Sequence, residues 1–308
     1  MGVKVVKIKI LGKGCHGVVH LVKTIAPVYN KVYAMKSADE DHYYSLFKEE
    51  EILQHFADSP NIVQCHGGFT SIEQERGVVY NMFLEYASGG SLVNLMKKNG
   101  GKVPERDVKC YTRMILQGLL DIHRKGFVHC DLKPGNILVF PDRDGTGVAS
   151  LKIADFGLAK QIGVNKVKYG FQGSWPYMSP ESLLGQVTGA LDVWSLGCVV
   201  VEMVTGGLPW DTCDAHDLMM KLFMGESPNI PEDMSILGKD FLKRCFVMDP
   251  NQRWSASMLL RHPYLRPEHE VPRGVQQSCN SSRFSTYFQE EKVFQPRLEH
   301  LLQRISEP

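Results

Sequence analysis

The stretch from His129 to Asn136, His-Cys-Asp-Leu-Lys-Pro-Gly-Asn, brings three chemically useful side chains close together. Asp131 could accept the proton of an attacking hydroxyl, and Lys133 could neutralise charge on a transferring phosphate. Asn136 could hold a magnesium ion through its amide oxygen. Aspartate, proline, glycine and asparagine are also common turn formers, so an ordinary turn is the alternative explanation.

A glycine-rich segment, Gly12 to Val19, follows an alternating apolar run from Val6 to Ile10. This pattern predicts a strand that enters a turn and returns as a second strand. Glycines let backbone N–H groups approach phosphate oxygens closely, because no Cβ stands in the way. The same glycine spacing opens dinucleotide-binding folds, but the apolar run from Val18 to Val22 favours a strand over the helix that such folds need.

Lys36 ends the short apolar segment Val32-Tyr33-Ala34-Met35-Lys36, which predicts another strand. An unpaired buried ammonium is costly, so Lys36 needs an anionic partner. Two partners are implied: nucleotide phosphates, and a glutamate of the following helix. We expect that helix around Tyr43 to Phe56, where Glu49, Glu50 and Glu51 are the candidates.

Three more motifs follow in order: Asp155-Phe156-Gly157 after an apolar strand, Ser179-Pro180-Glu181, and Asp192-Val193-Trp194-Ser195-Leu196-Gly197. With the segments above, they resemble the ordered motifs of eukaryotic protein kinases: the glycine-rich loop, V-A-I-K, H-R-D-x-K-x-x-N, D-F-G and A-P-E. The resemblance implies an α+β, bilobal protein kinase fold. Its small N-lobe is mainly β with one helix, and its larger C-lobe is mainly α.

The resemblance also implies ATP and Mg²⁺ as cofactors and gives the residues their roles. Asp131, Lys133 and Ser174 would be catalytic, and Asn136 and Asp155 would hold the metal. The residues that it places around ATP are Leu11, Gly12, Lys13, Gly14, Cys15, His16, Gly17, Val18, Val19, Ala34, Lys36, Glu49, Glu85, Ala87 and Leu138.

Some of these roles come from the family alone. In the family, the paired glutamate stands three residues before Ile-Leu, which selects Glu49 and leaves Glu50 and Glu51 on a solvated acidic face. Leu84 would border the back of the adenine site, and Arg253 would pair with Glu181. For the four apolar residues that would enclose the adenine, burial in the core is an equally good explanation; these residues are Leu11, Val19, Ala34 and Leu138.

Two positions depart from the usual pattern. Cys130 replaces the arginine that in most kinases binds a phosphate on the activation loop. The segment from Leu158 to Gly173 contains no serine or threonine, and only Tyr169 could be phosphorylated there. We therefore predict that loop ordering does not need Ser/Thr phosphorylation in this segment. Ser174 stands where the family often has threonine, so it keeps a hydroxyl, and Lys133 indicates Ser/Thr specificity.

The domain is expected to span residues 1–266, with the N-lobe at about 1–87 and the C-lobe at about 88–266. Helix-period runs are expected at Val108–His123 and Leu191–Val204. Residues 267–308 form a tail that is linker-like at first. Helical periodicity returns at Val293–Ile305. This segment could form a helix that binds a partner or a short helix that packs on its own domain.

The composition limits the other possibilities. A formal net charge of +1 gives no reason to expect nucleic acid as a partner. No long uninterrupted apolar run predicts a membrane span. Eight scattered cysteines without a C-x-x-C pair favour reduced thiols in a cytoplasmic or nuclear protein.

Within the kinases, the chain looks most like the plant MEKK-like MAP kinase kinase kinases. Three stretches carry this resemblance: the catalytic loop from His129 to Asn136, the sequence G-S-W-P-Y-M-S-P-E-S, and the sequence L-D-V-W-S-L-G-C-V-V-V-E-M-V-T-G-G-L-P-W. That resemblance implies MAP kinase kinases as substrates. A Ser/Thr kinase of another group is the competing enzyme. A pseudokinase scaffold is the competing class, although every role in phosphoryl transfer has its residue.

Overall fold

The computed structural model describes residues 4–14, 17–25, 31–74, 76–142, 145, 147–163 and 173–266. Cys15, His16, Tyr169 and the tail at 267–308 lie outside the described residues, and the predictions made for them stay predictions. The expected boundaries near residues 87 and 266 also stay predictions.

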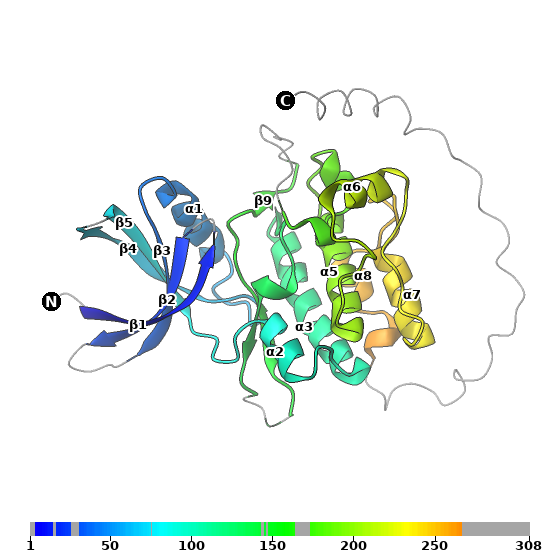
Figure 1. Cartoon of the computed structure of the whole chain (residues 1–308), viewed down its shortest axis with the longest axis horizontal. Helices are drawn as coiled ribbons and strands as arrows, with labels where there is room; N and C mark the ends of the chain where they lie inside the picture. Colours follow the sequence, from blue (N-terminus) through cyan, green and yellow to red (C-terminus); the bar gives the residue numbers. More distant parts are fainter. Residues whose placement is uncertain are drawn as a thin grey trace, which may run out of the picture. The chain divides into compact units, whose positions relative to one another are not determined.

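The N-lobe is a five-stranded antiparallel sheet in the order β1-β2-β3-β5-β4, with one helix against it (Figure 1). Its elements are β1 (Lys4–Gly14), β2 (Gly17–Ile25), β3 (Val32–Ala38), α1 (Tyr43–Gln54), β4 (Cys65–Glu73) and β5 (Gly77–Glu85). The expected pair of strands joined by a glycine-rich turn is confirmed, because β1 and β2 pair from Lys4 and Ile25 to Gly14 and Gly17. The helix ends before the expected Phe56 because the N–H groups of His55 and Phe56 bond three residues back, to Ile52 and Leu53, which tightens the last turn.

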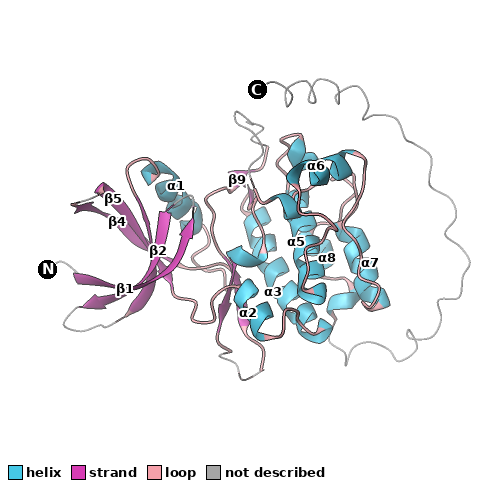
Figure 2. Cartoon of the chain, viewed as in Figure 1, coloured by secondary structure: helices cyan, strands magenta, loops and turns pink. Residues whose placement is uncertain are grey.

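The C-lobe is mainly helical, and the division between strands and helices is plain in Figure 2. Its helices are α2 (Leu92–Lys98), α3 (Glu105–Arg124), α4 (Pro180–Leu183), α5 (Gly189–Thr205), α6 (Ala215–Phe223), α7 (Ile236–Cys245) and α8 (Ala256–Leu259). Short 3₁₀ turns lie at Pro134–Asn136, Trp175–Tyr177 and Pro263–Leu265. Two small antiparallel sheets join β6 (Phe127–Val128) to β9 (Lys160–Gln161) and β7 (Ile137–Phe140) to β8 (Ser150–Ile153).

The two long helices differ in how they are buried. Helix α3 buries one face, with Val108, Ile115 and Ile122 at helical spacing, and carries acidic residues in its first turn and basic residues in its last. Helix α5 is buried on nearly all sides, as expected of a helix at the centre of a lobe. It stops at Gly206, whose φ of 78° suits glycine at the end of a helix. No described helix is long and apolar enough to cross a membrane.

A buried ion pair joins α4 to the loop before α8. The guanidinium of Arg253 donates to both carboxylate oxygens of Glu181 at 2.5 and 3.0 Å, as the kinase resemblance implied. Arg253 also donates to the carbonyls of Val247 and Ala190 and lies over the ring of Trp194. Both charged side chains are almost completely buried, so each needs the other.

We expect Arg253→Met to lower the free energy of unfolding by about 3–5 kcal/mol, because it leaves the buried carboxylate of Glu181 without a cation. Urea denaturation measures the change. The control is Arg244→Met, which breaks the exposed pair between Arg244 and Asp240 and should cost less than about 1 kcal/mol. Equal losses in the two variants would contradict the importance of the buried pair.

Candidate active site

Asp131 is the centre of a compact hydrogen-bond network in the catalytic loop. Its carboxylate accepts from Lys133 Nζ at 2.8 Å and from Ser174 Oγ at 2.9 Å. Lys133 also donates to Ser174 Oγ at 2.7 Å, so the Ser174 hydroxyl bridges the aspartate and the lysine. Asn136 Nδ2 donates to the backbone and side chain of Asp131 at 2.9 and 3.0 Å. The structure thus brings together the three residues expected to be catalytic, Asp131, Lys133 and Ser174, and places Asn136, which was expected to hold magnesium, beside them.

Asp192 of α5 accepts hydrogen bonds from the backbone of the catalytic loop. Its carboxylate accepts from the N–H groups of His129 and Cys130 at 2.9 and 3.0 Å and from His123 Nε2 at 2.8 Å. Burial raises the pKa of Asp192, but the bonds from His123 and the loop backbone outweigh it and leave the pKa below its usual range. Cys130 adopts a φ of 65°, which is uncommon for a residue other than glycine. This carboxylate therefore fixes an unusual backbone bend directly before Asp131.

Lys36 lies between two carboxylates. Its Nζ is 2.7 Å from Glu49 Oε2 and 2.9 Å from Asp155 Oδ1. Burial lowers the pKa of Lys36, but the two carboxylates more than reverse this and raise it above its ordinary value. Glu49 also accepts from the N–H of Phe156 at 3.2 Å, which ties helix α1 to the Asp-Phe-Gly motif. The choice of Glu49 as the partner of Lys36 agrees with this geometry.

The expectation of a solvated Glu50 is wrong. Its side chain is buried beneath the sheet, where Tyr80 Oη donates to Oε2 at 2.5 Å and Gln54 Nε2 donates to Oε1 at 3.3 Å. The pKa of the Tyr80 hydroxyl is raised, mainly by burial and next by the hydrogen bond to Glu50. Glu51 is exposed, as expected. Three consecutive glutamates point to different sides of a helix, and the run of letters did not reveal that two of them face the core.

The oxygen ligands expected for magnesium fit that ion. Asn136 uses its amide nitrogen on Asp131, which leaves the amide oxygen as its ligand group. Asp155 has one oxygen on Lys36, but its side chain is still 41% exposed and its φ is 66°. Because the carbonyl of Asn136 accepts from the N–H of Ala154 at 2.8 Å, the two residues are joined through the backbone. Mg²⁺ prefers one or two such protein oxygens together with phosphate oxygens.

The glycine-rich hairpin approaches β3 closely. Gly17 has a φ of 127°, and a Cβ at this position would lie 2.2 Å from the carbonyl oxygen of Ser37. Only glycine fits there. Of the other hairpin residues expected at ATP, Gly12, Lys13, Gly14, Val18 and Val19 lie on β1 and β2, whereas Cys15 and His16 fall outside the described residues.

The apolar residues expected around the adenine differ in burial. Ala34 belongs to the hydrophobic core, and Val19 and Leu138 are partly buried against it. Leu11 is 39% exposed, which disagrees with a core position. Leu84 pairs with Ala34 at the end of β5, and Glu85 and Ala87 follow on the segment that leads to the C-lobe.

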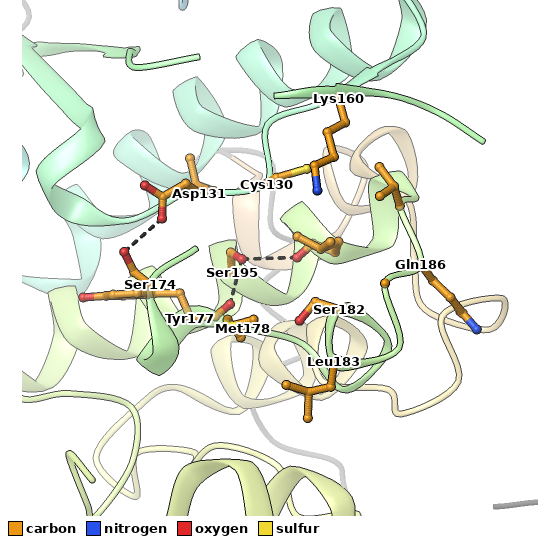
Figure 3. Close-up of a pocket in the computed structure, with 14 residues that line it drawn as sticks. Cys130, Asp131, Lys160, Ser174, Tyr177, Met178, Ser182, Leu183, Gln186 and Ser195 are labelled. Atoms are coloured by element: carbon orange, nitrogen blue, oxygen red, sulfur yellow. Dashed lines mark hydrogen bonds between the residues drawn. The ribbon is translucent and has the colours of Figure 1, made fainter. Parts of the chain in front are cut away.

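A cavity of about 50 Å³ lies beside the catalytic loop, and Asp131 is part of its lining (Figure 3). Its lining includes Cys130, Lys160, Ser174, Ser182 and Gln186. Sequence reasoning missed this cavity, because it is formed by segments that are distant along the chain. It also missed the contacts of Asp192 with the loop, although the Asp-Val-Trp-Ser motif had marked that residue as noteworthy.

Comparison with known proteins agrees with this geometry. The protein kinase domain family model matches residues 5–265. Mitogen-activated protein kinase kinase kinase 20 of Arabidopsis thaliana is 42% identical over 242 residues, which cover 75% of this chain and 69% of that protein. Mitogen-activated protein kinase kinase kinase 17 of the same plant is 34% identical over 271 residues, 85% of this chain and 70% of that protein. Cell division control protein 7 of Schizosaccharomyces pombe is 35% identical over 97% of this chain but only 26% of its own length.

The bilobal fold, the family match and the ordered motifs agree with one another. The chain belongs to the protein kinase family and is a serine/threonine protein kinase that resembles the plant MEKK-like MAP kinase kinase kinases.

Proposed function

We propose that this kinase is a MAP kinase kinase kinase, which transfers the γ-phosphate of ATP to serine or threonine residues of MAP kinase kinases. The observation that carries the chemistry is the bridge that Ser174 forms between Asp131 and Lys133. The names of the Arabidopsis relatives support the position in the cascade. A cytoplasmic or nuclear location is part of this proposal.

In the proposed mechanism, Asp131 accepts the proton of the substrate hydroxyl. Lys133, which contacts both Asp131 and Ser174, stabilises negative charge on the phosphoryl group as it moves. Lys36, held by Glu49, binds the α- and β-phosphates. Asn136 and Asp155 would hold magnesium, which would neutralise negative charge on the phosphates.

Two other functions give different experimental results. A Ser/Thr kinase of another group is favoured by the alignment with cell division control protein 7, which covers nearly the whole chain. A pseudokinase scaffold would bind nucleotide without transferring phosphate. The complete set of Lys36, Asp131, Lys133, Asn136 and Asp155 argues against the scaffold.

The deciding experiment follows radiolabel transfer from ATP and Mg²⁺ to a kinase-dead MAP kinase kinase and, in parallel, to a generic basic protein. We expect labelling of activation-loop Ser/Thr in the first substrate. Asp131→Asn should lower kcat at least about 100-fold, because it removes the proton acceptor. Asp107→Asn is the matched control: it makes the same substitution in the first turn of α3, and we expect it to leave kcat unchanged.

The other outcomes are equally informative. Labelling of the generic protein alone would contradict the cascade position and keep the kinase. Binding of ATP without any transfer by the wild type would favour the scaffold.

Ser174 allows a sharper test of the catalytic geometry. Ser174→Ala removes the bridging hydroxyl, so we expect kcat to fall about tenfold or more as Asp131 and Lys133 lose their common partner. Ser174→Thr keeps a hydroxyl and should retain most of the activity. Steady-state kinetics on the generic substrate measures both. If the threonine variant were as slow as the alanine variant, the hydroxyl bridge would not be the reason.

Cys130 supports the proposal that loop phosphorylation on Ser/Thr is not required. Its thiol is mostly buried and lies 3.5 Å from the carbonyl of Val128. Burial is the main cause, and the nearby Asp192 carboxylate the next, of a thiol pKa raised to about 12. A cysteine carries no positive charge in either protonation state, so Cys130 cannot form the ion pair that an arginine forms with a loop phosphate. The contacts of Lys36 with Glu49 and of Asp131 with Ser174 use residues outside Leu158–Gly173.

We therefore expect phosphatase-treated kinase to keep its activity towards the generic protein. The measurement is the initial rate before and after treatment, with complete dephosphorylation verified by mass spectrometry. Loss of activity that maps to Tyr169, the one residue between Asp155 and Gly173 with a hydroxyl group, would show that loop phosphorylation is needed after all and would overturn the proposal.

A further inference from the structure

The segment that links the lobes is tied to the C-lobe by an ion pair. Glu85 is the last residue of β5, and both of its carboxylate oxygens accept from Lys152 Nζ of β8, at 2.6 and 2.8 Å. The two side chains are 18% and 17% exposed, so water screens the pair only in part. Lys152 also lies over the ring of Phe140, which restricts its position further.

The same carboxylate holds a third segment. Glu85 Oε1 accepts from the N–H of Gln64 at 2.8 Å, and the N–H of Glu85 donates to the carbonyl of Gln64 at 3.0 Å. The side-chain amide of Gln64 donates in turn to the carbonyls of Ser59 and Ile62 at 3.0 and 2.9 Å. We refer to Gln64, Glu85 and Lys152 as the hinge clamp.

The loop between α1 and β4 also contacts β8 directly. The N–H of Val63 donates to the carbonyl of Ile153 at 2.9 Å, and the N–H of Ile153 donates to the carbonyl of Asn61 at 2.8 Å. Strand β8 therefore makes two kinds of contact. Its backbone bonds to the loop between α1 and β4, and its Lys152 side chain bonds to Glu85. The strand then leads directly into Asp155, which contacts Lys36 at the opposite end of the nucleotide site.

This arrangement links both ends of the site. Glu85 and Ala87 lie on the segment expected at the adenine, and Asp155 lies at the phosphates. We propose that the hinge clamp sets the distance between these ends, and that Lys152 is a positioning residue for ATP which does not itself touch the nucleotide. The proposal rests on the assignment of Glu85 and Ala87 to the adenine. A site that is ordered before binding loses less entropy when its ligand arrives, so the clamp should act on nucleotide affinity.

The test is Lys152→Met, which keeps an unbranched side chain but removes the charge. We expect KM for ATP to rise about tenfold, which corresponds to about 1.4 kcal/mol, while kcat stays nearly unchanged. Lys152→Arg keeps the cation and should restore KM. The dissociation constant of Mg·ADP, from calorimetry, should rise in parallel with KM. Generic basic protein serves as substrate, so the result does not depend on whether MAP kinase kinases are the physiological substrates.

Two controls separate the clamp from general destabilisation. Lys7→Met breaks an ion pair of similar length within the N-lobe sheet, between Lys7 and Glu73, and should leave KM for ATP unchanged. Glu85→Gln keeps the size and backbone of the hinge residue and should raise KM as Lys152→Met does. If the two residues act as one pair, the double variant should be no worse than either single variant. This second route also tests the proposal if Lys152→Met folds poorly.

Three results would overturn the proposal. An unchanged KM in the folded Lys152→Met and Glu85→Gln variants, with a lower unfolding temperature, would show that the pair only stabilises the fold. A lower KM or a higher kcat would show that it restrains the enzyme. Equal effects in Lys7→Met would show that any loss of an N-lobe ion pair suffices.

Discussion

The active site depends on the hydrogen bonds between the buried carboxylate of Asp192 and the backbone of the catalytic loop. A charge with no exposure to water must be compensated, and Asp192 is compensated by two N–H groups of the catalytic loop and by His123. This requirement works in both directions. The carboxylate needs the loop for its hydrogen bonds, and the loop, with Cys130 at a φ of 65°, needs the carboxylate to hold an uncommon backbone conformation. Asp131 follows directly on this bend, so its position derives from the centre of the C-lobe.

From that point, contacts spread outward in two directions. Through Lys133 and Ser174, Asp131 joins the segment before α4, where the substrate hydroxyl would arrive. Through the carbonyl of Asn136, the loop bonds to Ala154 and so reaches Asp155, Lys36 and helix α1. The N-lobe helix is thus placed relative to the C-lobe by charges at the nucleotide site. The chemistry and the arrangement of the lobes consequently share the same residues.

Much of this was predictable from the sequence, and the physical reason differs between elements. The β1–β2 hairpin was predictable from alternation and glycine spacing, and the need of Lys36 for an anionic partner from its place on an apolar strand. The fold class and the choice of Glu49 came from the resemblance to the kinase family, and the contact of Lys36 with Asp155 was not predicted. The burial of Glu50 was not predictable in this way, because it depends on Tyr80, which lies thirty residues further along the chain and meets it only after the sheet forms. The same applies to Asp192 and to the pair of Glu85 and Lys152, whose partners come from separate elements. The signal available for Asp192 was its place in a recognised motif, which marked the residue but not its contacts.

The buried charges of the described residues show a common logic. Each of them has a partner: Lys36 with Glu49, Glu50 with Tyr80, Glu181 with Arg253, and Asp192 with the catalytic loop. Buried ion pairs contribute little net stability compared with apolar residues of the same shape, so stability alone is a weak explanation for them. Three of the four act on segments that lack a long backbone ladder: Asp192 on the catalytic loop, Glu49 on the N–H of Phe156 just after β8, and Arg253 on the short helix α4. In such segments a directional, charge-assisted contact specifies a position that no regular hydrogen-bonding pattern provides. Phosphoryl transfer depends mainly on position, because the protein contributes little covalent chemistry to it. The charges are therefore concentrated where positional precision matters most to the reaction.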